Sequence, residues 1–348
     1  MNYELFQHPD THIFLVDMSK ELNHYFSEIV DQSIRKQLRE GKKIGIMVNK
    51  KGYSQGIICH HCGHIPQCKK CSVAISYHKQ LNGEMIGLCH ICKTQYNFPH
   101  ECPHCHSKEI KNFGLGTQQV AEIMKREYQT DAFIIESERL NSPSKIKNAT
   151  EEIQNAEYQV IVGTSLLSQP IREYPLDVII FLNADIGLNI PDFKASENNF
   201  NLLYETFTKH QTKHFIVQSF NPDQHSLRFA CKLDAEGFYE KEHAFRKEYN
   251  YPPFADLCVI LYKNEIEEKV FKKVDTLHKD LLYLAEKYEM KDLEIYSTPP
   301  LIYKMFGKYR YNIIIKGKNV RNFMDIVYSK LNLNAKGFKI NWDADTIV

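Results

Sequence analysis

Short apolar runs alternate with longer segments of helical periodicity over roughly the first two thirds of the chain. Apolar runs bounded by polar residues are typical of strands buried in a parallel sheet, whereas apolar positions three and four residues apart predict helices. The expected strands are residues 12–17, 43–49, 132–136, 159–162, 177–182 and 214–219. The expected helices are residues 21–39, 118–128, 144–155 and 196–209. This alternation predicts an α/β domain built on a parallel sheet.

From about Tyr249 the order of the expected elements changes. A strand at 255–262 precedes a long helix at 265–288, strands at 293–296 and 309–315, a helix at 320–331 and a strand at 338–342. This β-α-β-β-α-β order is typical of a ferredoxin-like α+β domain. We therefore expect one α/β domain formed by residues 1–52 and 113–235, an insertion at 53–112, and a C-terminal α+β domain at 236–348.

Length and composition narrow the class of protein. The 348 residues are enough for about two domains. Hydrophobic residues make up 43% and charged residues 25%, and no apolar run approaches the roughly 18 residues of a membrane span. Because no basic segment followed by an apolar one marks an export signal, the sequence predicts a cytoplasmic protein without a membrane partner. The net charge of +1 means that any strongly charged binding surface must be local.

Eight of the ten cysteines form four C-x2-C pairs between Cys59 and Cys105. In a reducing compartment, cysteines with this spacing are metal ligands before they are disulfides. A tetrahedral Zn²⁺ takes two such pairs, so four pairs predict two sites with no open coordination position. Sites of this kind stabilise a fold and do not catalyse a reaction.

The spacing between the pairs predicts how they combine. Seventeen residues separate Cys71 from Cys89, which suits a zinc ribbon, whereas only five separate Cys62 from Cys68. We therefore expect the two outer pairs to bind one zinc and the two inner pairs to bind the second. The outer site is Cys59, Cys62, Cys102 and Cys105, and the inner site is Cys68, Cys71, Cys89 and Cys92.

The segment that carries these cysteines stays basic after metal binding. From Gly41 to Phe113 ten lysines stand against three acidic residues, and eight thiolates with two Zn²⁺ leave a net charge of about +3. Tyrosines and histidines lie among the lysines, a mixture that suits phosphate contact and base stacking. The simpler interpretation is that the metal only holds together a segment too polar to fold alone, with the histidines hydrogen-bonded or solvated near the ligands.

A second basic region lies near the C-terminus. Between Ser297 and Asn341 nine lysine and arginine residues stand against one acidic residue, Asp325. Aromatic residues are interleaved with these cations, so stacking on bases and neutralisation of phosphates are both available. The residues expected to bind DNA are Lys304, Lys308, Tyr309, Arg310 and Lys316. The alternative interpretation is a solvated strand face with aromatic residues in the core.

The sequence cannot encode a complete P-loop ATPase. It contains no G-x4-G-K-[ST] motif and no strand that ends in an acidic tetrad able to hold Mg²⁺. Two glycine-containing turns can approach a phosphate or a nucleic-acid backbone. They comprise Gly114, Gly116 and Thr117 before a helix, and Gly163 and Thr164 after a strand. Glycine at such a turn is usually only a matter of backbone geometry.

Taken in order, several segments resemble one family closely. The C-terminal half of the primosomal protein N′ (PriA) family, superfamily 2 DNA helicases of replication restart, contains segments similar to "VNKKGYS", the four cysteine pairs, "GLGTQQV", "IVGTSLL", "NADIGLNIPDFKASENNFNLL", "SFNPDQH" and "YPPFADL". The resemblance spans nearly the whole chain. The "IPDFKASE" segment and the cysteine pairs are its most specific parts.

This resemblance implies a second RecA-like helicase lobe, interrupted by a two-zinc domain that engages DNA and primosome partners. It also implies a C-terminal DNA-binding domain similar to ribosomal protein S10. Asp185 matches an acidic residue of the family's second lobe and is a candidate contact to a nucleotide or the DNA backbone. The partners that the resemblance implies are forked or single-stranded DNA, single-strand binding protein and primosome components.

Several features of the family pattern are missing or altered. The first lobe, with its Walker A lysine and DEAH box, does not occur in the sequence. The family also carries a Q-x-x-G-R-A-G-R segment that supplies arginine to the ATP γ-phosphate, whereas residues 203–214 read "LYETFTKHQTKH". Because an arginine finger contributes about 10³- to 10⁵-fold in rate, we expect ATP turnover to be crippled. After Thr164 a K-G-H-type turn is replaced by "SQPIR", in which Arg172 is either a DNA contact or a surface loop residue.

These observations support three interpretations. The favoured one is a zinc-containing, PriA-like DNA-binding scaffold in DNA replication restart or repair that has no autonomous helicase activity. The second is lobe 2 of a split ATP-dependent 3′ to 5′ DNA helicase, which binds ATP only when a separate lobe 1 is supplied. The third is an unrelated zinc-ribbon interaction protein. The first predicts DNA affinity that depends on salt and does not depend on ATP.

Overall fold

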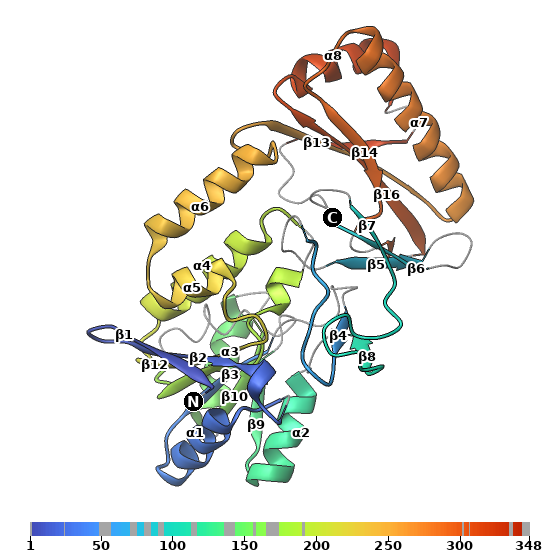
Figure 1. Ribbon diagram of the computed structural model, residues 1–348. Helices are drawn as coiled ribbons and strands as arrows, with labels where there is room; N and C mark the ends of the chain where they lie inside the picture. Colours follow the sequence, from blue (N-terminus) through green and yellow to red (C-terminus); the bar gives the residue numbers. More distant parts are fainter. Residues whose placement is uncertain are drawn as a thin grey trace. The chain divides into compact units, whose positions relative to one another are not determined.

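The computed structural model describes residues 2–23, 25–48, 57–69, 75–79, 85–89, 94–112, 117–135, 143–155, 158–164, 174–189, 192–300, 303–305, 307–333 and 337–342. The chain divides into two compact units (Figure 1). The first unit comprises Met1–Gln67, Phe98–Asn189 and Ser196–Phe238. The second unit comprises Cys68–Asn97, Ile190–Ala195 and Tyr239–Val348. The two units do not coincide with the four segments expected from the sequence, so the division into four segments stays a prediction.

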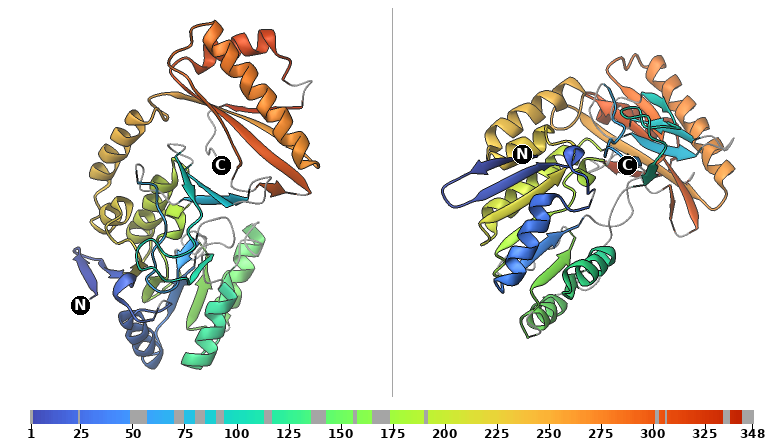
Figure 2. Two further views of the ribbon diagram at one scale, coloured as in Figure 1. Left: turned by 45° about the vertical axis from the view of Figure 1, so that its right-hand side comes forward. Right: turned by 60° about the horizontal axis from the view of Figure 1, so that its bottom comes forward.

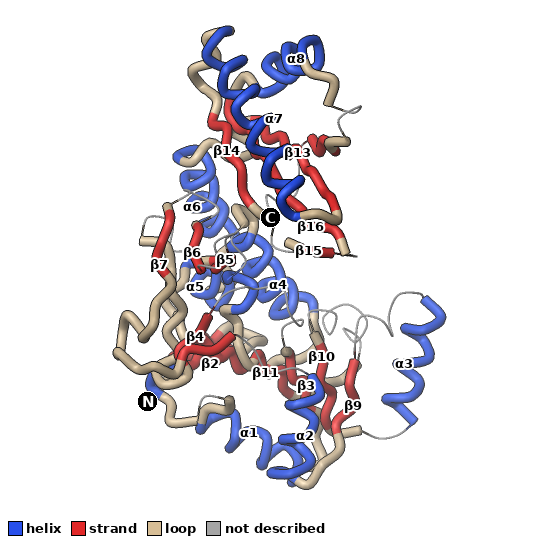
Figure 3. The backbone as a smooth tube through the Cα atoms, turned by 90° about the vertical axis from the view of Figure 1, so that its right-hand side faces the viewer, coloured by secondary structure: helices blue, strands red, loops and turns tan. Residues whose placement is uncertain are grey.

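The first unit contains a seven-stranded sheet, which we call the large sheet. Its strands are β1 (Tyr3–Gln7), β2 (His12–Asp17), β3 (Ile44–Met47), β9 (Ala132–Ile135), β10 (Val160–Gly163), β11 (Val178–Phe181) and β12 (His214–Ser219). Their order across the sheet is β1-β2-β12-β11-β3-β10-β9, and β11, β3, β10 and β9 can be followed side by side in Figure 3. Neighbouring strands are parallel except β1 and β2, which form an antiparallel hairpin at one edge (Figure 2).

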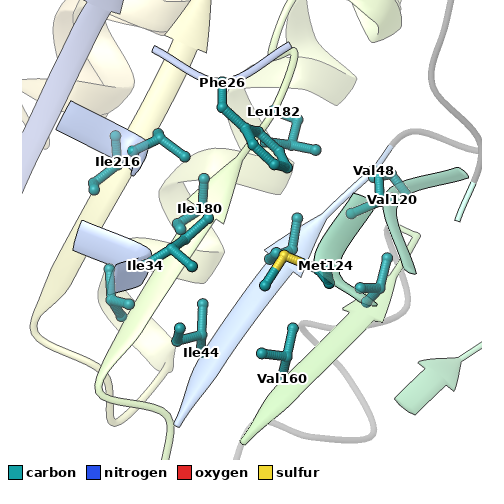
Figure 4. Packing of buried hydrophobic residues seen from close by; sticks show 14 of the residues in the cluster. Phe26, Ile34, Ile44, Val48, Val120, Met124, Val160, Ile180, Leu182 and Ile216 are labelled. Atoms are coloured by element: carbon teal, nitrogen blue, oxygen red, sulfur yellow. The ribbon is translucent and has the colours of Figure 1, made fainter. Parts of the chain in front are cut away.

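Helices cover both faces of the large sheet. The first unit contains α1 (Glu28–Arg39), α2 (Thr117–Tyr128), α3 (Pro143–Asn155), α4 (Ala195–Lys209) and α5 (His225–Cys231), whereas α6 (Ala235–Glu248) begins in the first unit and lies mostly in the second. Ile34 of α1 and Met124 of α2 pack in one cluster with alternate strand residues such as Ile180 (Figure 4). The next strand residue, Phe181, points to the opposite face and contacts Phe207 of α4. Each such side chain stabilises the fold by about 1.5–3 kcal/mol through burial.

Helix α1 begins at Glu28, so the expected helix start at residue 21 was wrong. The side-chain oxygen of Asn23 accepts hydrogen bonds from the backbone N–H groups of Tyr25 and Phe26, which folds this segment into a turn. The buried side chain of Gln218 then donates to the Tyr25 carbonyl and accepts from the Ser27 N–H. These side chains satisfy backbone groups that a longer helix would need for its own hydrogen bonds.

The second unit contains a smaller antiparallel sheet, which we call the small sheet. Its strands are β13 (Asp256–Asn264), β14 (Glu294–Thr298), the short β15 (Lys304–Met305), β16 (Lys308–Gly317) and β17 (Lys339–Trp342). The order is β14-β16-β13-β17, with β15 paired to β16. With α7 (Glu267–Lys287) and α8 (Val320–Lys330), and setting β15 aside, the elements follow the β-α-β-β-α-β order that the sequence predicts.

Helices α7 and α8 pack on the same face of the small sheet. Residues such as Leu277 of α7 and Phe323 of α8 form one cluster with Ile260 and Ile315 of the strands. The outer face of α7 is charged, so this 21-residue helix is amphipathic. Across the described residues, no helix combines the length and apolar character that crossing a membrane requires.

The cysteine-containing segment supplies short strands to both units. In the first unit β4 (Ile57–Cys59) pairs with β8 (Ile110–Asn112) in an antiparallel ladder that places Cys59 opposite Ile110. In the second unit β5 (Ser76–Lys79), β6 (Met85–Leu88) and β7 (Gln95–Asn97) form a three-stranded antiparallel sheet. The outer cysteine pairs thus fall in the first unit, whereas Cys68 and Cys89 fall in the second.

Candidate metal centre

Four cysteine side chains converge in the first unit. The Sγ atoms of Cys59, Cys62, Cys102 and Cys105 all lie within 4.8 Å of one another. The Sγ atoms of Cys59 and Cys105 are 3.6 Å apart, as are those of Cys62 and Cys102. Four sulfurs at 2.3 Å from a tetrahedral Zn²⁺ would be about 3.8 Å from one another. The four thiol groups can therefore hold a metal ion, and they are the four that the nested pairing predicts.

Two loops of matching backbone geometry present these cysteines. In the first loop the Cys59 N–H donates to the His64 carbonyl at 2.9 Å, and the Gly63 N–H donates to the Cys59 carbonyl at 2.8 Å. In the second, the Cys102 N–H donates to the Ser107 carbonyl at 2.8 Å, and the His106 N–H donates to the Cys102 carbonyl at 2.9 Å. The residue after the second cysteine is left-handed in both loops, with φ of +73° at Gly63 and +60° at His106. This turn directs both sulfurs of each pair toward one point.

The electrostatics of the four thiols favour a bound cation. Burial raises the pKa values of Cys59 and Cys62, because a thiolate loses hydration there. A hydrogen bond from the Ser107 N–H lowers the pKa of Cys105 to about 7. The His104 N–H also points at the Cys102 sulfur, at 3.4 Å. These amides stabilise part of the negative charge, and a divalent metal would neutralise the rest.

His64 and His104 lie beside the cysteines and stack on each other, with ring centroids 5.6 Å apart and planes at 12°. Burial lowers the pKa of His64, which favours its neutral form. Neither histidine belongs to the group of ligand atoms formed by the four sulfurs. Both therefore pack around the loops rather than complete the cluster.

The inner cysteines are described only in part. Cys68 and Cys89 are buried in one cluster of the second unit with Phe193, Tyr251 and other apolar residues. The Cys89 N–H donates to the Thr94 carbonyl at 3.0 Å, the same backbone bond that opens each loop of the outer set. Cys71 and Cys92 lie outside the described residues, so the second metal site stays a prediction.

Three of the candidate nucleotide or DNA-backbone contacts, Gly163, Thr164 and Asp185, lie near the carboxyl ends of parallel strands, where open α/β sheets bind ligands. Asp185 follows β11 and is 2% exposed. Its two oxygens accept hydrogen bonds from the Ser219 hydroxyl and the Phe220 N–H, both at 2.6 Å. Burial raises the pKa of Asp185 to about 6. The Asp185 carboxylate thus holds the loop that follows β12 in place.

The two glycine-containing turns are only partly described. Gly163 ends β10, and among the described residues the buried hydroxyl oxygen of Thr164 has no hydrogen-bond partner. Thr117 is the first residue of α2 and is buried. Gly114, Gly116 and Arg172 lie outside the described residues, so a ligand site at these turns stays a prediction.

The structure separates the cations and aromatic residues expected to bind DNA. Tyr309 lies on the helix-covered side of the small sheet, where the Lys304 ammonium is 4.3 Å from its ring centre. Strand alternation places Lys308, Arg310 and Lys316 on the other side. Lys316 is also buried: its side chain is 2% exposed, and its ammonium donates to the Tyr249 carbonyl at 2.7 Å. Because the ammonium is already held inside the second unit, Lys316 is removed from the surface expected to contact DNA.

No protein-family model matches the chain. The chain is 31% identical over 315 residues to replication restart protein PriA of Borreliella burgdorferi, which covers 88% of this chain and 46% of the relative. It is 29% identical over 318 residues to PriA of Bacillus subtilis, covering 88% of this chain and 38% of the relative. PriA of Rickettsia conorii is 28% identical over 312 residues, covering 87% of this chain and 47% of the relative.

The chain therefore spans less than half the length of these curated relatives. The aligned region nevertheless includes nearly all of this chain, and so both units described above. Over most of its length, this chain is PriA-like in sequence.

Proposed function

We propose that this chain is a metal-containing, DNA-binding protein of replication restart and primosome assembly, without autonomous helicase activity. The observation that carries the proposal is the similarity to replication restart protein PriA over 85–89% of the chain, at 24–31% identity. The cluster of four cysteine sulfurs supports the proposal that the chain contains a metal ion.

In this proposal the metal is structural Zn²⁺. Four thiolates fill a tetrahedral shell and leave no position for a substrate or a water molecule. Cys59, Cys62, Cys102 and Cys105 would hold one ion, and Cys68, Cys71, Cys89 and Cys92 a second. The Cys89–Thr94 backbone bond supports the second site, because the same bond occurs in both loops of the outer set.

The two sheets would have different tasks. The parallel large sheet, with helices on both faces, supports the assignment of a RecA-like helicase lobe 2 that the cysteine ribbon interrupts after β3. The order β14-β16-β13-β17 supports a ferredoxin-like C-terminal domain, similar to ribosomal protein S10, as a DNA-binding module.

Two features of the sequence support the absence of autonomous helicase activity. Between Leu203 in α4 and His214 at the start of β12 there is no arginine to reach an ATP γ-phosphate. A missing arginine finger lowers the rate of ATP hydrolysis by about 10³- to 10⁵-fold. The sequence also contains no Walker A motif.

One observation favours the alternative of a split helicase. Asp185 and the buried Thr164 hydroxyl lie where a parallel sheet binds a nucleotide, although Asp185 already holds the loop after β12. The alternative requires ATP turnover that depends on adding a separate polypeptide with Walker A and DEAH motifs. Turnover by such a mixture, and none by either part, would favour it over the scaffold.

The DNA-binding part can be tested by charge reversal. The variant Lys304→Glu, Lys308→Glu and Arg310→Glu should weaken binding to forked and single-stranded DNA at least tenfold. It should also lower the salt dependence, by about 0.9 in the logarithmic slope for each lost duplex phosphate contact. Fluorescence anisotropy at two salt concentrations measures both quantities.

A matched control changes the net charge by the same amount elsewhere. Lys269→Glu, Lys272→Glu and Lys279→Glu alter exposed lysines on the outer face of α7. This control should retain most of the affinity. Equal losses in both triple variants would show that the region around β15 and β16 is not the DNA-binding surface.

A further inference from the structure

The loop of the first cysteine pair packs against Phe220, which directly follows β12 of the large sheet. Gly63 follows Cys62 and has a φ of +73°, and its α-carbon faces the ring of Phe220. A Cβ atom at position 63 would lie 2.7 Å from Cγ of Phe220 and closer still to Cδ1 and Cε1. Real Cβ atoms essentially never come within 3.0 Å of another heavy atom. The ring therefore occupies the space where any other residue at 63 would carry a side chain.

Asp185 fixes the backbone of Phe220 through a hydrogen bond from the Phe220 N–H. One carboxylate oxygen of Asp185 accepts the Phe220 N–H, and the other accepts the Ser219 hydroxyl. The Ser219 oxygen in turn accepts the Asn221 N–H at 2.9 Å. The Phe220 side chain also packs against the apolar cluster shared by the large sheet, α1 and α2. A continuous set of contacts thus runs from the carboxyl edge of the sheet to the Cys59–Cys62 loop.

The second cysteine loop provides an internal contrast. His106 occupies the position that corresponds to Gly63 and has the same left-handed conformation, with a φ of +60°. Its side chain is 75% exposed and pairs with Glu101 at 3.1 Å. A non-glycine residue is therefore compatible with the backbone of this loop when nothing packs against it. Gly63 differs because Phe220 lies there.

We infer that Phe220 is a positioning residue for the metal centre: seated on Gly63 and held by Asp185, it fixes the Cys59–Cys62 loop to the large sheet. A loop that is already in place costs less free energy to order around a metal ion, so binding is tighter and release slower. By linkage, bound metal must stabilise the packing of residues 219–221 to the same extent. The inference rests on the proposed metal centre and adds a residue that is not a ligand.

The test is the rate of zinc release from the full chain to a chromogenic chelator. With two metal sites the release has two phases, and Cys105→Ser identifies the phase of the outer site by removing it. Phe220→Ala should accelerate that phase by roughly 5- to 150-fold, the range of typical coupling energies, and leave the other phase unchanged. Phe220→Leu, which keeps part of the side chain, should give an intermediate rate.

A matched control uses Phe14, which is half-buried against the same apolar cluster but belongs to β2. Phe14→Ala should leave the outer release phase within about twofold of the wild type, because the Phe14 ring packs on Tyr3, whereas the Phe220 ring packs on Gly63. Gly63→Ala should accelerate release strongly in the wild-type background. It should do so much less when combined with Phe220→Ala, because the ring with which the new Cβ collides is then absent.

A second measurement needs no variant. In the wild-type chain, hydrogen exchange of the Phe220 amide should slow when zinc is bound and recover when zinc is removed. The inference would be overturned if Phe220→Ala released zinc at the wild-type rate, or if hydrogen exchange at Phe220 did not depend on zinc. Neither result would contradict the proposed function. If the wild-type chain shows no release phase that Cys105→Ser removes, both the inference and the proposed metal centre are overturned.

Discussion

The ammonium of Lys316 donates a hydrogen bond to the carbonyl of Tyr249, with 2.7 Å between the two atoms. It also lies 4.2 Å from the centre of the Tyr251 ring and 3.5 Å from a carboxylate oxygen of Glu294. A buried cation is tolerated only when its lost hydration is replaced, and these three groups replace it. Lys316 is therefore a structural residue of the second unit.

We predict that Lys316→Ala lowers the free energy of unfolding by about 1–3 kcal/mol, because it removes a buried hydrogen-bond donor from the Tyr249 carbonyl. Urea denaturation followed by circular dichroism measures this change. The neighbouring Lys318 is exposed, and Lys318→Ala should cost less than about 0.5 kcal/mol. Similar small losses in both variants would contradict a structural role for Lys316.

The pH dependence of stability should carry a contribution from Asp185. Burial raises its pKa from 3.8 to about 6 in the folded chain. The folded state therefore binds this proton more tightly than the unfolded state does. The contribution of Asp185 to the free energy of unfolding is therefore highest below pH 4, and it falls as the pH rises through 6. The full loss corresponds to about 3 kcal/mol at most.

Asp185→Asn removes the titrating group and keeps an oxygen that can accept the Phe220 N–H. The stability of the wild type relative to this variant should fall between pH 4 and pH 7, as measured by urea midpoints at several pH values. Taking the difference cancels groups that titrate equally in both proteins. A difference that stays constant over this range, or rises, would contradict a buried Asp185 with a raised pKa.

The metal content should depend on individual outer cysteines. We predict that Cys102→Ser lowers the zinc content by one ion per chain in native mass spectrometry, because three thiolates bind Zn²⁺ far less tightly than four. Cys231 is the matched control: it is buried in α5, and burial raises its pKa to about 12, so it stays a neutral thiol. Cys231→Ala should leave the zinc content unchanged, and an equal loss in both variants would refute the assignment.

Most strands and helices were predictable because buried strands and amphipathic helices leave local patterns. The strand expected at 214–219 has these bounds in the structure. Helix α6 was missed because polar residues take inward positions on it. Glu242 and Arg246 are buried there as an ion pair with 3.1 Å between the charged atoms, which interrupts the apolar stripe. Strand β1 was missed because its residues are largely exposed.

The outer cysteine set was predictable from spacing alone, since ligand geometry restricts which pairs can meet. The buried position of Lys316 was not predictable from the sequence, because its partners Tyr249 and Glu294 come from other segments of the second unit. The contact of Phe220 with Gly63 was equally hidden. The glycine of a cysteine loop is explained by backbone geometry, and no local pattern indicates that an aromatic ring also requires it.

The central claim is that this chain binds DNA and does not turn over ATP by itself. The most direct test measures ATPase rate with and without forked DNA, and DNA affinity at two salt concentrations, on one zinc-loaded preparation. We predict salt-dependent DNA binding that ATP does not alter, and no turnover above background. ATP turnover stimulated by DNA would contradict this account and would mean that the chain holds a complete nucleotide site.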